Sequence, residues 1–255
     1  IRRVSPWLRG SEALLIVDGE GGEVASRRYA NGWDFGAKDG SLVAAKHGGT
    51  ATTPLWPLEG DAAVEALRVI PTETGWSLVF RRAGKIVHGE LRSENGKPVP
   101  EGTLVVHDST AEKVGPPTIA KNHGHTMIAW AEKQEANWTL KVFSSTAGAT
   151  KTFSTRGNPQ AADQLSPSLA AVNDQAFFFT WTEGAGDKNE VWGVLLDSNV
   201  NVSGSLTRLS WEGGNAGKAQ VAVGKDGRGI VGFLEGSGKQ MDVIASSIVC
   251  RSDAP

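Results

Sequence analysis

The stretch TMIAWAEK, residues 126–133, alternates apolar with small or polar side chains and places a glutamate two positions after an aromatic residue. A segment of the same shape returns as FFFTWTEG at 177–184 and as GIVGFLEG at 229–236. Such self-similarity at a nearly constant interval indicates a repeat architecture, in which each copy is one supersecondary unit. The rest of the chain is therefore best interpreted in the same register.

A fourth copy precedes these three. Phe80, Trp130, Trp181 and Phe233 are separated by 50, 51 and 52 residues, and Arg82 takes the place of the glutamate in the first of them. Short strands are predicted on both sides of each aromatic strand, at 66–70, 117–121, 167–171 and 219–223 before it and at 85–92, 138–144, 190–196 and 241–249 after it. A fourth strand follows, for example at 103–107 and 205–210. Each repeat thus predicts a four-stranded antiparallel meander.

The aromatic strand is apolar or small on both of its faces. Phe177, Phe179 and Trp181 point one way, while Phe178 and Thr180 point the other way. A sheet of this kind must be covered on both sides. Radial stacking of meanders meets that need, so the sequence predicts an all-β, five-bladed β-propeller of four-stranded antiparallel blades.

The repeat length sets the predicted boundaries of this single domain, residues 1–255. The blades are expected at about 11–60, 61–110, 115–160, 165–212 and 217–250 plus 1–5. In the first repeat, strands are expected at 12–17 and 23–29, whereas the last repeat lacks a fourth strand. IRRVS at 1–5 matches LTRLS at 206–210, so the N-terminal strand is predicted to complete the last blade and close the ring.

The pattern resembles bacterial β-propeller repeat proteins, those with sialidase-type or lectin-type repeats in the broad sense. The segments NHGHTMIAW at 122–130 and KDGRGIVGF at 225–233 are similar to the turn and strand of the sialidase Asp box, although the full Asp-box pattern is absent. The likeness covers essentially the whole chain but uses degenerate motifs. It implies the architecture alone, because a fold does not determine a function.

Composition excludes several classes of partner. The 26 basic and 28 acidic residues are interspersed and leave a net charge of -2, without the basic stripe that a nucleic acid or an anionic membrane surface would require. No apolar run approaches the roughly 18 residues of a membrane helix, so no membrane insertion is expected. The lone Cys250 excludes internal disulfides and paired-cysteine metal sites, and no metal or other cofactor is predicted. A first residue of Ile1 fits a removed export signal, which predicts an extracytoplasmic location.

The residues two positions after each aromatic are candidate functional groups. Glu132, Glu183, Glu235 and Arg82 are expected at the ends of second strands, where they would ring one face of the propeller. Converging carboxylates could act as general acid and base in glycoside hydrolysis. The structural interpretation is the stronger one, since each shares a face with a core aromatic and could accept hydrogen bonds from the neighbouring blade.

Tryptophan residues in connecting segments are the second set of candidates. Trp7, Trp33, Trp56 and Trp211 lie in Gly- or Pro-rich connections that are expected on the same face as the glutamates. Exposed aromatics on loops can stack on a sugar ring or anchor a protein partner. Alternatively, they fill the gaps between blades.

Together these eight candidates favour an exported, non-enzymatic binding module that presents a loop-rich face to a glycan or protein ligand. No catalytic residue is assigned, and the nucleophile pattern GxSxG does not occur. One alternative is a glycoside-processing enzyme that uses the ring of glutamates. A second alternative is a structural subunit of a larger surface assembly.

Overall fold

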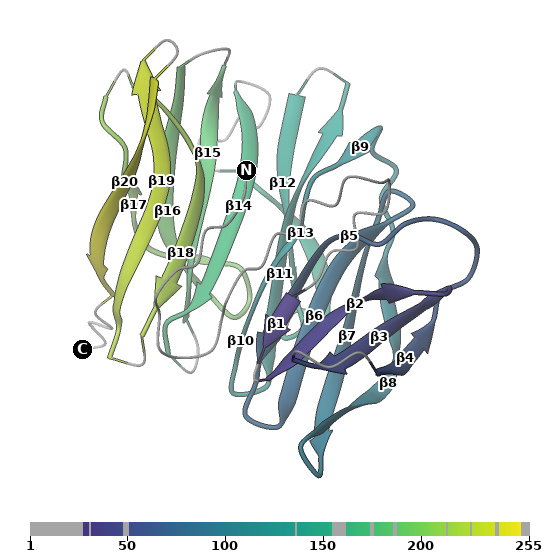
Figure 1. Ribbon diagram of the computed structural model, residues 1–255. Coiled ribbons are helices and arrows are strands. Elements are labelled where there is room, and N and C mark those ends of the chain that lie inside the picture. The colour runs from purple at the N-terminus through teal and green to yellow at the C-terminus, as the bar shows by residue number, and fades with distance from the viewer. Residues whose placement is uncertain are drawn as a thin grey trace. The chain divides into compact units, whose positions relative to one another are not determined.

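The computed structural model describes residues 28–30, 32–47, 51–135, 137–154, 162–173, 176–185, 188–212, 214–224, 226–237 and 240–250 (Figure 1). Within these ranges every regular element is a β-strand, and the strands form antiparallel sheets, which confirms the all-β prediction. The described part of the chain contains no helix long and apolar enough to cross a membrane. The chain groups into two compact units, Ile1–Thr110 and Ala111–Pro255, and each is described by itself below.

The described residues of the first unit form two four-stranded meanders. Its strands are β1 (Arg28–Ala30), β2 (Trp33–Lys38), β3 (Ser41–Lys46) and β4 (Thr52–Pro57), followed by β5 (Glu65–Pro71), β6 (Gly75–Arg82), β7 (Lys85–Glu94) and β8 (Lys97–His107). Side chains from both sheets form one buried cluster, in which the rings of Phe35 and Trp76 lie 6.0 Å apart between centroids. Phe80 belongs to this cluster, so the aromatic of the second repeat faces the sheet before it.

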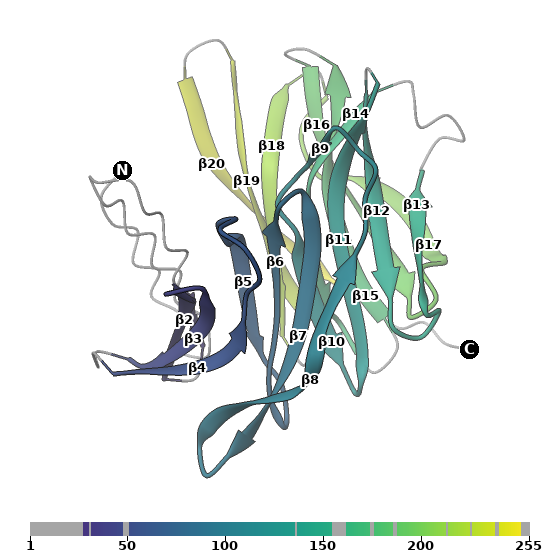
Figure 2. The same cartoon turned by 90° about the vertical axis from the view of Figure 1, so that its right-hand side faces the viewer.

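The described residues of the second unit form three sheets. Its strands are β9 (Lys113–Val114), β10 (Thr118–Asn122), β11 (His125–Gln134), β12 (Asn137–Ser144) and β13 (Ala149–Phe153), then β14 (Asp163–Ala171), β15 (Ala176–Ala185), β16 (Lys188–Asp197) and β17 (Val202–Arg208), and finally β18 (Asn215–Val223), β19 (Arg228–Ser237) and β20 (Gln240–Val249). Figure 2 shows these sheets following one another through the unit.

The middle sheet of the second unit is covered on both faces, as the two-sided apolar pattern of β15 predicts. Phe179 and Trp181 pack against the preceding sheet, where Phe153 meets both rings edge-on at 5.1 and 5.2 Å. Phe178 faces the other way and joins the cluster that contains Phe233 of the last sheet. Sheets stacked in this way bury most of the aromatic surface of the repeat.

The first strand of each sheet from β5 onwards is interrupted at the same repeat position. The register shifts lie beside Ala66, Ser166 and Lys218, whose φ angles are 51°, 51° and 56°. In the third repeat the break between β9 and β10 is the segment 115–117, Gly-Pro-Pro, whose prolines have no N–H for a ladder hydrogen bond. The repeat is therefore visible in the backbone as well as in the side chains.

The first sheet differs from the prediction. The strand expected at 23–29 is described only from residue 28, and there it forms β1, the first strand of its sheet, rather than the second. The second strand is β2, because Asp39 and Gly40 have φ angles of 49° and 69° and close a two-residue hairpin between β2 and β3. This local turn, and not the repeat spacing, sets the register of the first sheet.

The last sheet has three strands in the described part of the chain, β18 to β20. Its predicted fourth strand, Ile1–Ser5, lies outside the described residues, as does the strand expected at 12–17. The closed ring, its count of five blades and the single-domain boundaries stay predictions.

Candidate functional site

The three repeated glutamates are buried, each at most 9% exposed, within the second strands β11, β15 and β19. In two of them the carboxylate accepts a hydrogen bond from the indole N–H two residues earlier. Trp130 Nε1 donates to Glu132 Oε1 at 2.8 Å, and Trp181 Nε1 donates to Glu183 Oε2 at 3.1 Å. Gln164 Nε2 at the start of β14 donates to the same Glu183 oxygen at 3.1 Å.

Where the aromatic residue is phenylalanine, whose ring has no N–H, the charged residue two positions later has another partner. Glu235, which follows Phe233, accepts a hydrogen bond through Oε1 from the main-chain N–H of Trp211 at 3.0 Å. Arg82, which follows Phe80, donates from Nε to the carbonyl of Ala62 at 3.0 Å and from its NH2 group to that of Gly60 at 2.7 Å. Both side chains thus hold the connection that leads into their own sheet, so all four residues have a structural role.

Two of the candidate tryptophans lie in strands rather than in loops, so their predicted placement is wrong. Trp33 is in β2 and donates to the Gly96 carbonyl at 3.0 Å, and Trp56 is buried in β4 and donates to the Gly102 carbonyl at 3.1 Å. Both acceptors belong to the β7 to β8 hairpin of the next sheet. These indoles fill the space between two sheets, which was the alternative interpretation.

Trp211 is the candidate that remains accessible. It lies in the connection between β17 and β18, and 77% of its surface is exposed. Trp7 lies outside the described residues. The connection is held beside β16, because Leu209 N donates to the Val191 carbonyl at 2.8 Å and Val191 N donates to Ser210 Oγ at 3.0 Å.

Two carboxylates meet one guanidinium next to Trp211. Arg208, at the end of β17, donates to Glu190 Oε1 and to Glu212 Oε2, each at 3.1 Å. The hydrogen bond with Glu212, together with the one with Glu190, raises the pKa of Arg208 above its usual value. We call Glu190, Arg208, Trp211, Glu212 and Glu235 the Trp211 cluster.

Glu235 binds the main chain of this cluster, because it accepts the hydrogen bond from Trp211 N. A Cβ atom on Gly214 would lie 2.7 Å from Glu235 Oε1, so a larger residue at this position would require the carboxylate to shift. The other oxygen, Oε2, is buried, and none of the described residues donates a hydrogen bond to it. Because buried polar atoms are almost always paired, this oxygen points to a donor such as a water or a ligand hydroxyl.

The sequence missed Glu190, Arg208 and Glu212. The segment RLSWE at 208–212 shows a basic and an acidic residue flanking an aromatic, and it could have drawn attention to two of them. The contact with Glu190 depends on the pairing of β16 with β17, whose register shifts between Gly193 and Leu195. Nothing in the sequence reveals that shift.

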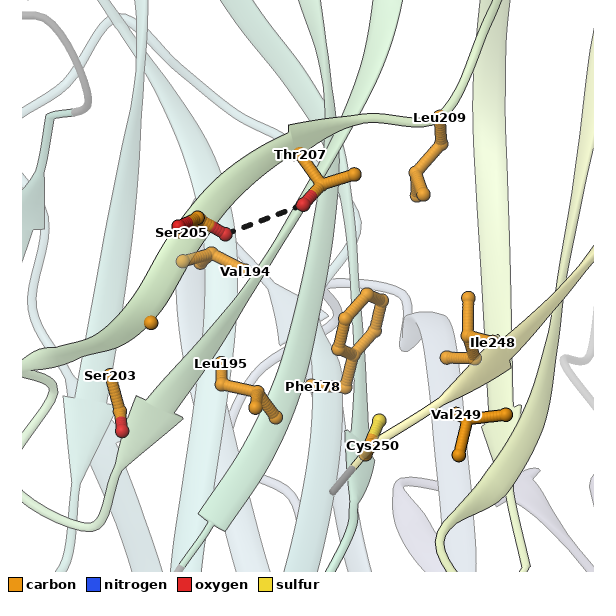
Figure 3. A pocket seen from close by; sticks show the side chains of 11 residues that line it. Phe178, Val194, Leu195, Ser203, Ser205, Thr207, Leu209, Ile248, Val249 and Cys250 are labelled. Carbon is orange, nitrogen blue, oxygen red and sulfur yellow. Dashed lines mark hydrogen bonds between the residues drawn. The ribbon is translucent and has the colours of Figure 1, made fainter. Parts of the chain in front are cut away.

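A groove of about 430 Å³ lies between β17 and β20 (Figure 3). Its walls are mainly apolar, with Phe178 and Leu195 between the two strands, Ile248 on the β20 side and the hydroxyls of Ser203 and Thr207 on the β17 side. Cys250 also lines it, and burial raises the pKa of its thiol. Among the described residues that line this groove there is no carboxylate and no histidine.

Metal binding has no basis in the described parts of the chain, where no three His, Cys, Asp or Glu side chains converge. The nearest approach is a pair, His88 and His107, whose Nδ1 and Nε2 atoms lie 2.9 Å apart. This distance is that of a hydrogen bond between the rings and leaves no room for an ion between those two nitrogens.

Comparisons with known proteins concern the fold. No protein-family model matches the chain, and no curated protein sequence matches it. An endo-arabinase from Bacteroides thetaiotaomicron is similar at 10% identity over 86% of this chain and 90% of its own, with a TM-score of 0.49. The NanB sialidase from Streptococcus pneumoniae is similar at 8% identity over 76% of this chain but only 32% of its own, with a TM-score of 0.44.

These findings correct the prediction of a non-enzymatic binding module. The similar solved chains carry the names of an endo-arabinase and a sialidase, which are enzymes and not binding modules. The structure also removes the exposed aromatic face on which that prediction depended, because Trp33 and Trp56 are held between sheets. What remains accessible is Trp211, with carboxylates beside it.

Proposed function

We propose that this chain is a glycoside-processing enzyme whose substrate binds at the Trp211 cluster. One observation carries the proposal: Trp211, which is 77% exposed, directly precedes Glu212 in the chain, and Glu212 shares the guanidinium of Arg208 with Glu190. An exposed indole offers a flat apolar surface with a polar edge, which suits the face of a sugar ring. The carboxylates supply the groups that glycosidic bond cleavage needs.

Glycoside hydrolysis uses one carboxyl group to protonate the leaving oxygen and a second to act as nucleophile or as base for water. Arg208 holds Glu190 and Glu212 through neighbouring nitrogens at 3.1 Å each. That bridge keeps the two carboxylates below the upper separation of about 9.5 Å found in such pairs. Glu190 and Glu212 are the two carboxylates of this proposal, and Glu212, whose side chain is 84% exposed, is the one that faces the solvent.

This assignment replaces the predicted ring of glutamates. Glu132 and Glu183 accept hydrogen bonds from buried indoles, and Glu235 holds the main chain of Trp211. Moving these carboxylates toward a substrate would leave buried donors unpaired, at a cost of about 1–3 kcal/mol each. The reactive pair is therefore placed at the more exposed Glu190 and Glu212.

The test is release of reducing ends from a panel of polysaccharides and aryl glycosides that includes arabinan and a sialoside. Glu190→Gln and Glu212→Gln are each expected to lower kcat by at least about 100-fold, the usual contribution of a general acid or base. Asp226→Asn is the matched control, since Asp226 is an exposed acid at the β18 to β19 turn that lies 3.9 Å from Arg228. It should retain wild-type turnover.

Circular dichroism would establish that all three variants are folded. Wild-type turnover in both glutamine variants would refute the assignment of the carboxylates. No release from any substrate on the panel would refute the proposed function itself.

The predicted extracytoplasmic location suits a polysaccharide substrate and forms part of the proposal. Fractionation of cells that produce the natural protein would test it. A protein ligand or a larger assembly stays a prediction, for which the described residues provide no contact.

A further inference from the structure

We infer that the Trp211 cluster takes an uncharged glycan and discriminates against acidic ones. This inference rests on the proposed function, because it names the substrate class of the same site. Three of the five residues in the cluster are carboxylates, Glu190, Glu212 and Glu235, and Arg208 is the single cation.

The cation of the cluster is already engaged. Arg208 donates from both terminal nitrogens to carboxylates of the same site. The two nitrogens that would together bind the carboxylate of a uronic or sialic acid are therefore already engaged. An acidic sugar stacked on Trp211 would instead meet the exposed carboxylate of Glu212, the next residue along the chain. Like charges at such short range repel each other.

Three further cations belong to the described strands of the same two sheets, and one of them, Arg228 of β19, lies 3.9 Å from Asp226. Lys188 stands two residues before Glu190 at the start of β16, and Lys218 stands at the bulge of β18. Both are exposed, and no contact joins either of them to the carboxylates of the cluster. They reduce the negative potential without providing a paired site for an anion.

The polar groups of the site match sugar hydroxyls. Glu235 Oε2 is a buried acceptor for which the described chain supplies no donor. Asn189 Nδ2 donates to Asn215 Oδ1 at 3.1 Å, so these amides join β16 to β18 beside the cluster. An acceptor-rich surface next to an indole complements the hydroxyl donors and the apolar face of a neutral sugar.

The experiment compares neutral with acidic polysaccharides by affinity gel electrophoresis of the full chain at low and high salt. Arabinan, galactan and xylan are the neutral probes, and polygalacturonate and polysialic acid are the acidic ones. The chain should be retarded by at least one neutral probe independently of salt, and Trp211→Ala should weaken that retardation about tenfold. The acidic probes should bind at least about tenfold more weakly.

Charge variants make the test specific. Glu212→Gln should strengthen the binding of an acidic probe about two- to fivefold, whereas Asp226→Asn, with the same charge change elsewhere, should not. Tighter binding of an acidic probe that depends on Trp211 and weakens with salt would overturn the inference but leave the proposed function intact. Retardation by no probe at all would overturn both.

Discussion

At the scale of single residues, one repeated position shows how a side chain selects its partner. Glu132 and Glu183 follow a tryptophan and accept its indole N–H, while Glu235 follows a phenylalanine and accepts a main-chain N–H. Arg82 also follows a phenylalanine and donates to main-chain carbonyls. The aromatic residue therefore decides whether the charged group satisfies a side chain or the connection between sheets.

Glu183 provides a stability test of this role. Glu183→Ala removes the acceptor of two donors, Trp181 Nε1 and Gln164 Nε2, and should lower the free energy of unfolding by about 2–4 kcal/mol. Glu183→Gln keeps one acceptor oxygen and should lose less. Urea denaturation followed by circular dichroism measures both, with the exposed Glu101→Ala as a control that stays within about 0.5 kcal/mol. An unchanged midpoint for Glu183→Ala would contradict the structural role.

The histidine pair of the first unit makes stability depend on pH. The rings of His88 and His107 stack at 5.1 Å, and burial, followed by the charge of His88, lowers the pKa of His107 from 6.5 to about 4. The unfolded chain takes up a proton near pH 6.5, whereas the folded chain does so only near pH 4. The contribution of His107 to the free energy of unfolding is therefore fully present above pH 6.5, falls between pH 6.5 and pH 4, and is constant below pH 4.

We expect the free energy of unfolding to drop by about 1–2 kcal/mol between pH 7 and pH 4, less than the whole shift would give, because solvent screening weakens the effect. Thermal melts at several pH values measure the drop. In His107→Leu the part of this pH-dependent drop that comes from His107 should disappear. The same slope in that variant would assign the effect to other groups.

At the scale of elements, the interrupted first strands link neighbouring sheets. Past the break in β14, Leu169 N approaches Thr118 Oγ1 of β10 at 3.4 Å, and past the break in β18, Val221 N donates to Ser168 Oγ of β14 at 3.1 Å. In the described sheets β14 and β18 each pair on one side only, so some of their main-chain donors face away from the ladder, and hydroxyls of the preceding first strand accept these two. This arrangement repeats with the sequence period.

The bulge residues have left-handed φ angles, which cost about 1–2 kcal/mol for residues other than glycine. Lys218 is exposed at a φ of 56°, so Lys218→Gly should raise the free energy of unfolding by up to about 1 kcal/mol. The control Ala222→Gly lies four residues further along the same strand, where φ is not positive, and should destabilise by about 0.5–1 kcal/mol. Destabilisation by both variants, measured by urea denaturation, would contradict the cost assigned to the bulge.

At the scale of the whole molecule, the last sheet determines how the protein behaves in solution. The outward face of β19 and β20 exposes four large apolar side chains, Ile230, Met241, Val243 and Val249. Within the described residues β20 pairs only with β19. Apolar strands at a sheet edge promote association between molecules.

Val243→Lys should therefore raise the solubility limit while the free energy of unfolding changes by less than about 0.5 kcal/mol. Val243 is 79% exposed, so a lysine fits without repacking. Light scattering over a range of concentrations measures the effect. Val202→Lys, at an exposed valine of β17, is the control and should help less, and an equal gain from both would show a general effect of charge.

The sequence by itself determined the all-β class, the position of the second strands and the period of the repeat. These features are local, since alternating side chains and glycine-containing turns specify hairpins within about twenty residues. The turn at Asp39 and Gly40 was visible in the same way, although the repeat spacing was wrongly preferred over it in the first sheet.

Only the tertiary structure decided which side chains meet between sheets. The indoles of Trp33 and Trp56 bond to carbonyls 63 and 46 residues away, and the contact of Arg208 with Glu190 depends on a shifted register. Such partners follow from the stacking of sheets and the position of a bulge, which no short segment of the chain encodes. Trp33 and Trp56, which were predicted to contact a ligand, instead lie between sheets and have a structural role. Trp211, in the connection after β17, is exposed and directly precedes Glu212.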